Sequence, residues 1–275
     1  MSGLHAWHPH ASCDASCVRV DPVGALGRFA SAVRAAYRLS LIIALLPVMP
    51  FLALPLPGQT PMVRMYWRFF VRCMGVRITL SGGPIRNLPG VLVVSGHVSW
   101  LDAFVIYSLM PTTFVAKKEV TEGPGLSSLA RVMKIIPIDR SNLRHLPEVV
   151  DTVTERLRSG QSVVAFPEGT TWCGLAHGEF RPAMFQAAID AGRPVQPLRL
   201  SYRQRDGRPS TAPAFVGEDT LLASILRVVS TRSVLANVHV EELQLPGEHR
   251  RELAVRCQEV VRGTDAARRE HALAA

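Results

Sequence analysis

The chain has 275 residues, of which 48% are hydrophobic, so it is long enough and apolar enough to fold around a sizeable core. This composition excludes a chain that is disordered throughout. Lysine and arginine number 31 against 22 for aspartate and glutamate, and the formal net charge of +9 favours an anionic partner, either nucleic acid or an acidic lipid surface. Composition alone does not choose between these two partners.

The first 24 residues are mixed and polar, show no pattern of a cleavable signal peptide, and predict a flexible leader. The five cysteines of the chain are odd in number and widely spread, which favours a reducing compartment that faces the cytosol. The leader holds side chains able to bind metal, at His5, His8, His10, Cys13 and Cys17. Their spacing matches no standard zinc pattern and nothing downstream completes the set, so we expect no metal and no cofactor.

The segment from Ala25 to Leu56 is strongly apolar, with three arginines in its first half and almost no charge in its second. A helix over residues 39–56 would be about 27 Å long, barely enough to cross a hydrocarbon core of about 30 Å. Pro47 and Pro50 would also break such a helix midway. We therefore expect a monotopic or re-entrant membrane anchor, with a buried core helix as the alternative.

A second helix is predicted to begin with a cap at Thr60 and to end at Gly75. Arg64, Arg68 and Arg72 recur every four residues and therefore stack on one face, while aromatic residues cover much of the remainder. This pattern is typical of a helix at a membrane interface, although a solvated face on an ordinary packed helix produces it equally often.

After this helix the pattern changes to short β-rich runs that alternate with helical ones, which is typical of an α/β domain. The fold class we predict is α/β, with a mixed, largely parallel sheet flanked by helices. The predicted strands are residues 76–80, 91–95, 113–116, 135–138, 163–166, 195–202 and 237–241. The predicted helices are residues 100–109, 126–133, 143–158, 182–191, 221–229 and 246–262. The predicted organisation is a flexible leader (1–24), membrane-associating helices (25–75), an α/β domain (76–263) and a tail (264–275).

The run VLVVSGHVSWLDAF places a buried strand before His97 and a helix after Ser99. Because five residues along one helix would put two side chains well apart around its axis, His97 must precede the helix that carries Asp102. A carboxylate in the first turn then accepts the ring N–H, which favours the imidazolium formed when His97 takes a proton. Ser99 and Asp102 also have the spacing of a capping box, in which Asp102 only bonds backbone amides.

Three further motifs follow HVSWLD in chain order: KIIPIDR, FPEGTTWCG and PVQPLRLSY. Together the four motifs resemble those of the glycerolipid acyltransferase family, which includes the 1-acylglycerol-3-phosphate acyltransferases and the lyso-ornithine lipid acyltransferases. The resemblance spans residues 91–200 in the main. Each motif is weak alone, whereas four in the same order are specific.

By this resemblance His97 is the general base that deprotonates the acceptor hydroxyl, and Asp102 orients it. The hydroxyl then attacks the thioester directly, without a covalent acyl-enzyme. The implied reaction moves a fatty acyl group from acyl-CoA or acyl carrier protein to the free hydroxyl of a lysolipid, in phospholipid biosynthesis. The implied location is the inner (cytoplasmic) membrane, with the catalytic domain facing the cytoplasm, in contact with membrane lipids and not with nucleic acid.

The resemblance also implies an acceptor site in the Pro-Glu-Gly-Thr turn. Cations at the ends of strands would converge on one rim of a mostly parallel sheet, which predicts an anion site, and the resemblance favours Arg140 as part of it. The residues predicted for the turn are Glu168, Gly169 and Thr170. The residues predicted for the anion site are Arg140, which ends the second motif, together with Lys117 and Lys118. An ordinary surface role remains an alternative for the two lysines.

Two positions depart from the pattern of many family members. Gly96 stands where they have an asparagine, and Thr171 stands where they have a basic residue after Glu-Gly-Thr. The second change removes an expected phosphate ligand. We therefore predict 1-acylglycerol-3-phosphate as the acceptor, and keep a lyso-ornithine lipid or another lysolipid as the alternative.

Other classes of protein fit the sequence less well. No Gly-x-Ser-x-Gly motif supports a serine hydrolase, although Ser95 lies near His97. Neither a phosphate-binding loop nor a complete Gly-x-Gly-x-x-Gly motif supports a nucleotide enzyme. A non-catalytic basic protein that binds acidic membranes explains the charge, but it gives His97 and Asp102 no role.

Overall fold

The computed structural model describes residues 11–19, 24–54, 58–84, 89–122, 126–139 and 142–273. Within these residues one seven-stranded sheet has the order β1-β7-β6-β2-β5-β3-β4, and only the β6–β7 pair is antiparallel. The strands are β1 (Val76–Gly82), β2 (Leu92–Ser95), β3 (Thr113–Lys117), β4 (Ile136–Ile138), β5 (Val163–Ala165), β6 (Val195–Arg203) and β7 (Val234–Val240). The predicted fold class, a mixed and largely parallel sheet flanked by helices, is confirmed.

Nine α-helices and three short 3-10 helices lie in the described part of the chain. The α-helices are α1 (Ala25–Leu45), α2 (Thr60–Cys73), α3 (Leu101–Leu109), α4 (Glu119–Glu122), α5 (Leu126–Val132), α6 (Leu146–Arg158), α7 (Ala183–Ala191), α8 (Leu221–Ser230) and α9 (Arg250–Leu273). The 3-10 helices are η1 (Ala15–Cys17), η2 (Leu46–Ala53) and η3 (Leu143–His145). Helix α4 was not predicted, because four residues are too few to show a helical period.

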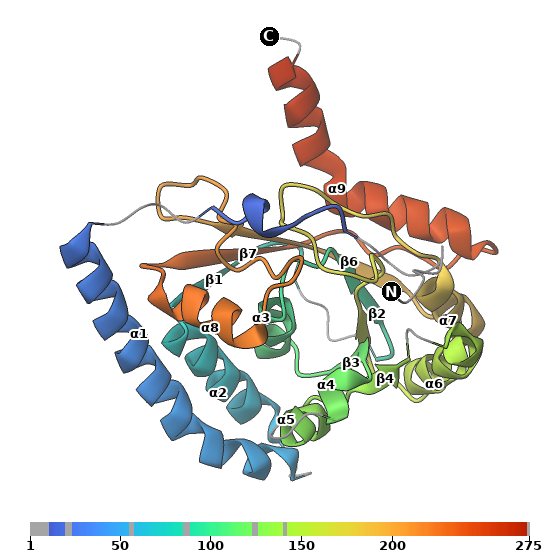
Figure 1. Cartoon of the computed structure of the whole chain (residues 1–275). Coiled ribbons are helices and arrows are strands. Elements are labelled where there is room, and N and C mark those ends of the chain that lie inside the picture. The colour runs from blue at the N-terminus through green and yellow to red at the C-terminus, as the bar shows by residue number, and fades with distance from the viewer. Residues whose placement is uncertain are drawn as a thin grey trace.

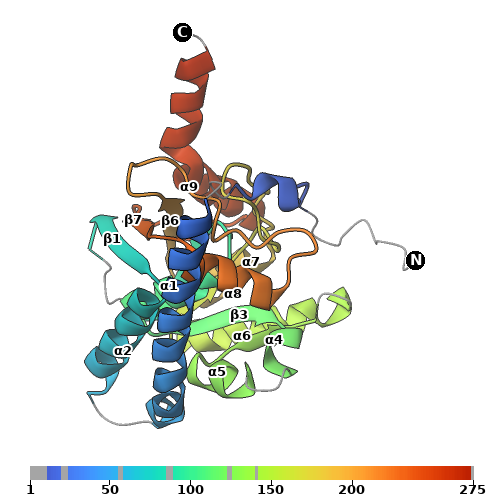
Figure 2. The same cartoon turned by 60° about the vertical axis from the view of Figure 1, so that its left-hand side comes forward.

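Helix α9 begins and ends later than the sequence predicts. It runs from Arg250 to Leu273, and therefore covers most of the segment expected as a tail. Its last turns extend away from the sheet in both Figure 1 and Figure 2. Gly263 does not end the helix, because a single glycine inside a helix costs only about 1 kcal/mol relative to alanine.

Helices cover both faces of the sheet, so the domain has three layers (Figures 1 and 2). Central strand β2 shows why: Val93 packs into the core on the side of α2, α3 and α8, while Leu92 and Val94 pack into the core on the side of α6, α7 and α9. A strand that is buried on both faces is expected to be apolar throughout. The continuous apolar run VLVV therefore fits a strand that is buried on both faces.

The apolar N-terminal segment forms α1 and then tightens into η2 at the two prolines, Pro47 and Pro50. The prolines end the α-helix because they lack an N–H for its hydrogen-bond ladder. The segment Ala25–Leu52 is long and apolar enough to cross a membrane by length and composition, and 22% of its most apolar window is buried. Most of this segment is therefore not covered by the rest of the chain.

Two of the α1 arginines bind the C-terminal end of α8. The guanidinium of Arg34 donates to the Ser230 carbonyl at 2.6 Å, and that of Arg38 donates to the Val229 and Thr231 carbonyls at 2.9 and 2.6 Å. The last carbonyls of a helix have no partner within the helix, and its dipole favours a cation there. These arginines therefore hold α1 lengthwise against the domain.

Helix α2 packs firmly into the domain. Trp67 is completely buried, stacks on Phe104 of α3 at 5.3 Å between ring centroids, and meets Tyr107 edge-on at 5.4 Å. Thr60 is the first residue of this helix and not its cap, which is Gln59. Gly75 ends the helix region with a φ of +84°, as predicted, because glycine adopts positive φ without strain.

Part of the expected flexible leader, residues 11–19, lies against the domain. Cys13 is 5% exposed and belongs to the core on the α2 side of the sheet. The Arg19 amide donates to the Thr211 hydroxyl at 2.8 Å, which ties the leader to the loop after β6. Asp14 caps the short helix η1 by accepting the Ser16 amide at 2.9 Å.

Candidate active site

The candidate site lies at the carboxyl ends of β2 and β5, which are parallel neighbours with Val94 paired to Ala165. Residues that follow two such strands emerge side by side at one edge of the sheet. The His97 ring stacks on the Phe166 ring with 4.0 Å between ring centroids and an angle of 12° between ring planes. The first and third motifs therefore meet in space.

His97 precedes α3 and contacts Asp102 in the first turn of that helix. Its Nδ1 lies 2.9 Å from Asp102 Oδ2, and the two side chains are 17% and 0% exposed. With an ionised carboxylate as acceptor, Nδ1 carries the proton and donates it, so Nε2 keeps a lone pair. The local geometry inferred from the sequence spacing is present.

Asp102 also bonds backbone amides at the start of α3, as the spacing allowed, although the N-cap of this helix is Trp100. Its Oδ2 accepts the backbone amides of Val98 and Ser99 at 2.7 and 2.9 Å. The two interpretations of Asp102 are therefore compatible, because one carboxylate oxygen accepts from the turn and from the imidazole. The bonds to these two amides fix the position of the carboxylate independently of its contact with His97.

Tyr202 is a further member of this network that the sequence did not indicate. It lies near the end of β6, the other neighbour of β2, and its hydroxyl donates to Asp102 Oδ1 at 2.6 Å. Burial, together with the negative charge of Asp102, raises the pKa of Tyr202 well above its ordinary value, so the phenol remains a donor. The only signal in the sequence was its place at the end of the PVQPLRLSY motif.

Glu168 faces the protein interior and is 4% exposed. Its Oε2 accepts the His97 amide at 2.8 Å, and its Oε1 accepts the Gly178 amide at 3.2 Å. Burial raises the pKa of Glu168 to about 7, although these two amides act to lower it. Both oxygens are thus engaged with backbone, and the carboxylate fixes the position of the His97 main chain.

The segment after Glu168 holds the other side of the His97 loop. The Trp172 amide donates to the His97 carbonyl at 2.7 Å, and the Phe215 amide donates to the Val98 carbonyl at 3.0 Å. The Thr171 hydroxyl donates to the Phe215 carbonyl. Three separate segments therefore fix the backbone around the histidine.

The remaining predicted site residues lie in different places. Gly169 has a φ of +72° in the turn after β5, and Thr170 follows it, partly exposed. Lys117 and Lys118 are exposed at the carboxyl end of β3, two strands away from β2 and therefore about 10 Å to the side. Arg140 lies outside the described residues.

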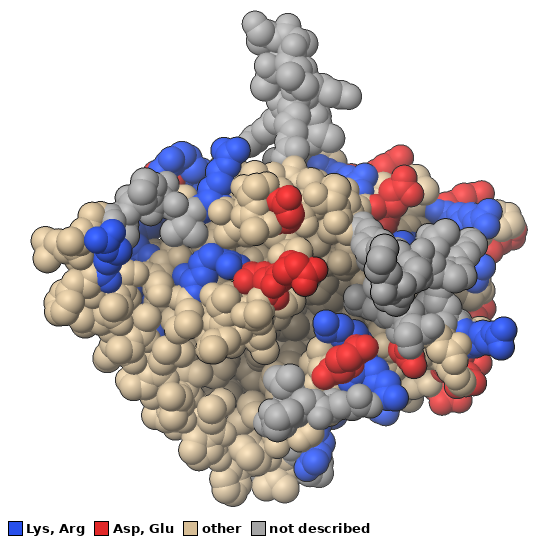
Figure 3. Space-filling model, viewed as in Figure 1, with Lys and Arg blue, Asp and Glu red and all other residues tan. Residues whose placement is uncertain are grey.

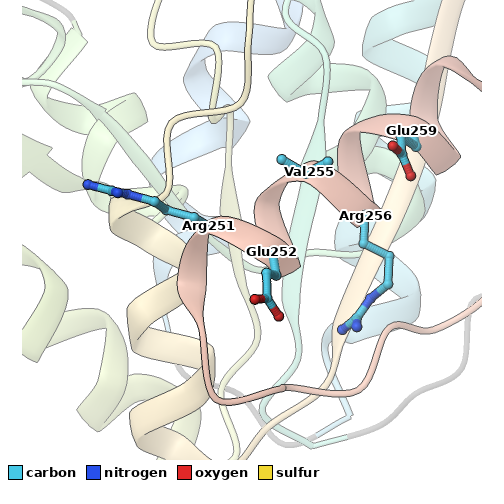
Figure 4. Close-up of a pocket in the computed structure, with 5 residues that line it drawn as sticks. All are labelled: Arg251, Glu252, Val255, Arg256 and Glu259. Carbon is cyan, nitrogen blue, oxygen red and sulfur yellow. The ribbon is translucent and has the colours of Figure 1, made fainter.

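A shallow hollow of about 440 Å³ lies along one side of α9 (Figure 4). It is lined by Arg251, Glu252, Val255, Arg256 and Glu259. None of these side chains is a histidine or a nucleophile, and His97 and Asp102 are not among them. This hollow is therefore not the candidate site.

The geometry fits a base that activates an external hydroxyl. Ser95 is fully buried and its hydroxyl has no hydrogen-bond partner within the described residues, so no serine is paired with His97 as a nucleophile. A histidine backed by a buried carboxylate at the carboxyl edge of an α/β sheet is the arrangement of an enzyme that works by general base catalysis.

The comparisons with known proteins agree with this class. A family model described as Acyltransferase matches residues 77–201, which include His97, Asp102 and Glu168. The lyso-ornithine lipid O-acyltransferase of Pseudomonas aeruginosa is 33% identical over 216 residues, which are 75% of this chain and 81% of that protein. The chain belongs to this acyltransferase family.

Two further proteins are similar over different shares of their length. The 1-acyl-sn-glycerol-3-phosphate acyltransferase of Neisseria gonorrhoeae is 36% identical over 160 residues, which are 57% of this chain and 62% of that relative. This chain therefore spans less than two thirds of that relative. The crystal structure of the 1-acyl-sn-glycerophosphate (LPA) acyltransferase PlsC from Thermotoga maritima matches with a TM-score of 0.61 and 16% identity, over 84% of this chain and 94% of that chain. This likeness shows the shared fold.

Proposed function

We propose that this protein is an O-acyltransferase that moves a fatty acyl group from acyl-CoA or acyl carrier protein to the free hydroxyl of a lysolipid. The observation that carries the proposal is the 2.9 Å contact between His97 and the fully buried Asp102 at the carboxyl edge of the sheet. The family of the chain and the names of its relatives give the reaction class.

In the proposed mechanism, Nε2 of His97 accepts the proton of the acceptor hydroxyl while the oxygen attacks the thioester carbonyl. The tetrahedral intermediate then collapses, the carbon–sulfur bond breaks, and the leaving thiolate takes the proton from the imidazolium. Asp102 stabilises the imidazolium between the two proton transfers. Tyr202 and the two amides hold Asp102 in place.

The acceptor that we propose first is 1-acylglycerol-3-phosphate. Lys117 and Lys118 are exposed at the same edge of the sheet as His97, and with Arg140 they would bind its phosphate. Gly169 and Thr170 would contact the headgroup beside the histidine. Glu168 would act through the His97 backbone and not by direct contact, because both of its oxygens already accept amides.

A lyso-ornithine lipid is the second candidate acceptor. It is favoured by Thr171, whose hydroxyl is bound to the Phe215 carbonyl at a position where many family members place a cation. An acceptor without a phosphate needs no cation at position 171, so Thr171 is compatible with such a lysolipid. Initial rates on the two lysolipids, measured at equal concentration with the same acyl donor, distinguish the candidates, and the larger kcat/KM identifies the preferred acceptor.

We further propose that the protein is a monotopic protein of the cytoplasmic face of the inner membrane. Large apolar side chains of α1, η2 and α2 are exposed on one side of the molecule, among them Phe29 (69%), Phe51 (66%) and Met65 (68%). Figure 3 shows the surface over α1 and α2 with few charged side chains. An exposed apolar surface of this extent is typical of membrane contact. Since Arg34 and Arg38 bind α8, α1 would lie along the membrane surface beside the domain and not cross it alone.

The test of the catalytic proposal uses purified protein, a lysolipid panel and both thioester donors. We expect His97→Ala to lower kcat by a factor of about 10² to 10⁴ and Asp102→Asn to lower it by at least about 10², because each removes general base catalysis. Both variants should still sediment with lipid vesicles. Undiminished acyl transfer by His97→Ala contradicts the mechanism, and wild-type protein that transfers to no lysolipid favours a membrane-binding protein without catalysis.

A further inference from the structure

Three cysteines from distant parts of the chain meet beside the candidate active site. The sulfur atoms of Cys13, Cys17 and Cys173 all lie within 4.8 Å of one another, and none is in a disulfide. Cys13 and Cys173 are 5% and 3% exposed, and Cys17 is partly exposed. A single disulfide would always leave the third thiol unpaired, so the cluster is better suited to a shared ligand.

The leader presents its two sulfurs from one rigid turn. The five metal-capable residues of the leader together match no standard zinc pattern, but the Cys13–Cys17 pair taken alone, with three residues between, lies within the spacing of two to four residues found in zinc sites. Cys173 supplies the downstream ligand that the sequence did not indicate, so the expectation of no metal is revised here. The turn between them is fixed by Asp14, whose carbonyl accepts the Cys17 amide at 3.1 Å and whose carboxylate accepts the Ser16 amide. The turn thus holds the two thiols close to each other.

The third sulfur lies beside backbone amides. Gly174, directly after Cys173, has a φ of +82°, and the amides of Leu175 and Ala176 in this turn bond the Cys173 sulfur. Amide hydrogen bonds to a sulfur ligand are the second layer of many metal sites. A purely apolar contact of three cysteines would need no such amides.

We propose that Cys13, Cys17 and Cys173 bind one zinc ion, with a nitrogen or oxygen atom as fourth ligand. Zinc–sulfur bonds of about 2.3 Å in a tetrahedron place the sulfurs about 3.8 Å apart, which the present spacing reaches with small adjustments. Thiolates select zinc over magnesium or calcium, which prefer oxygen. On binding, the three thiols release their protons to the solvent.

The ion would clamp the leader to the loop that supports His97. Cys173 follows Trp172, whose amide holds the His97 carbonyl at 2.7 Å. On the other side the leader is tied to the loop after β6, through Arg19 and Thr211. Zinc would therefore have a structural role and would not touch the reacting groups. The inference stands on these cysteines alone and does not depend on the proposed acyl transfer.

The test begins with the metal content of full-length protein expressed with added zinc and purified under reducing conditions. We expect about one zinc per chain by mass spectrometry, and a loss of at least ten-fold in bound zinc for Cys173→Ser and for Cys13→Ser. Cys73→Ser is the matched control, because Cys73 is also buried but lies on α2 away from the cluster, and it should keep its zinc.

Wild-type protein provides a second readout that does not depend on how the variants fold. After removal of metal with a chelator, Co²⁺ should bind with one equivalent and give the absorption of tetrahedral cobalt thiolate, and Zn²⁺ should abolish it. Cys17 should react with iodoacetamide in the metal-free protein and be protected when zinc is restored. Protein without zinc that also binds no Co²⁺ overturns the proposal, and so does a disulfide between two of these cysteines in freshly alkylated cells.

Discussion

Asp102 accepts four hydrogen bonds, and they come from a loop, a helix start and a strand. The donors are the His97 imidazole, the Val98 and Ser99 amides and the Tyr202 hydroxyl. Four donors fix both carboxylate oxygens in position. Apart from His97, these donors take no part in the proposed reaction, so the orientation of Asp102 rests on groups that would contact no substrate.

Tyr202→Phe tests the most distant of these groups. We expect kcat to fall about ten-fold with KM nearly unchanged, because Asp102 Oδ1 loses its donor and orients His97 less well. Burying an unpaired carboxylate oxygen should also lower the free energy of unfolding by about 1 to 3 kcal/mol.

Tyr107→Phe is the control for the loss of a buried tyrosine hydroxyl, because Tyr107 is equally buried. Its hydroxyl donates to the Val132 carbonyl at 2.9 Å, and this hydrogen bond lies away from the site. It should lower stability but leave kcat unchanged. Steady-state kinetics and denaturant unfolding measure both quantities. Equal effects of the two variants on kcat would refute a positioning role for Tyr202.

The raised pKa of Glu168 predicts that the stability of the fold depends on pH. Its pKa is raised from 4.5 to about 7, so the folded state keeps a proton that the unfolded state has already released. The Glu168 carboxyl therefore contributes fully to the free energy of unfolding below about pH 4.5. This stabilisation, about 3 kcal/mol in total, is lost as the pH rises through about 7.

Glu168→Gln should remove this part of the pH dependence, measured as the free energy of unfolding in urea between pH 5 and pH 8. Glu179→Gln, at an exposed glutamate of the same segment, should leave it intact. If wild type and Glu168→Gln lose stability in parallel over this range, the buried carboxyl is not its source.

At the scale of elements, α1 and η2 combine two properties. Arginines on one side of α1 bind the end of α8, whereas apolar side chains on the other side are exposed. An apolar surface of this kind gains free energy by entering the interface of a bilayer, in proportion to the area that leaves water. Helix α1 and η2 therefore cover part of the domain and also form the proposed membrane contact.

The double variant Phe29→Glu, Phe51→Glu tests the membrane contact. Because both rings are exposed, the folded state should be unaffected, and sedimentation with vesicles of anionic and zwitterionic phospholipid should drop at least ten-fold. Val255→Glu is the control, since Val255 is half exposed on α9, which packs on the opposite face of the sheet. Unchanged sedimentation of the double variant would exclude this surface as the anchor.

At the scale of the whole molecule, the predicted membrane-associating segment 25–75 is part of the folded domain. Trp67 and Val71 of α2 are completely buried in the core that also contains residues of α3, β1 and β7. Removing such side chains costs several kcal/mol each, which approaches the whole stability of a typical domain. We therefore expect the N-terminal helices to be required for the structure of the site, in addition to their proposed contact with the membrane.

Deletion of residues 1–75 should accordingly give protein without cooperative unfolding, detected by near-UV circular dichroism and a broad thermal transition. Deletion of residues 1–10, outside the described part of the chain, is the control and should leave a cooperative transition. A cooperatively folded 76–275 fragment would show that the α/β domain is independent of α2.

The sequence by itself determined the local features of this protein. The apolar run of β2, the alternating helices and strands, and the spacing of His97 and Asp102 are short-range patterns, so the α/β fold and the dyad geometry followed from them. The break of the first helix at Pro47 and Pro50 was also predicted. The ends of α9 and the short helix α4 depended on packing and weak local signals, and the sequence did not predict them.

Contacts between distant segments were decided only by the tertiary structure. Tyr202 reaches Asp102 because β6 pairs with β2, Glu168 bonds the His97 amide because β5 lies on the other side of β2, and Cys173 joins Cys13 and Cys17 because the leader folds back. Strand order is not encoded in any local period, since it follows from how the whole chain buries its apolar faces. The sequence therefore indicated the pair that we propose to react, whereas the structure revealed what holds it in place.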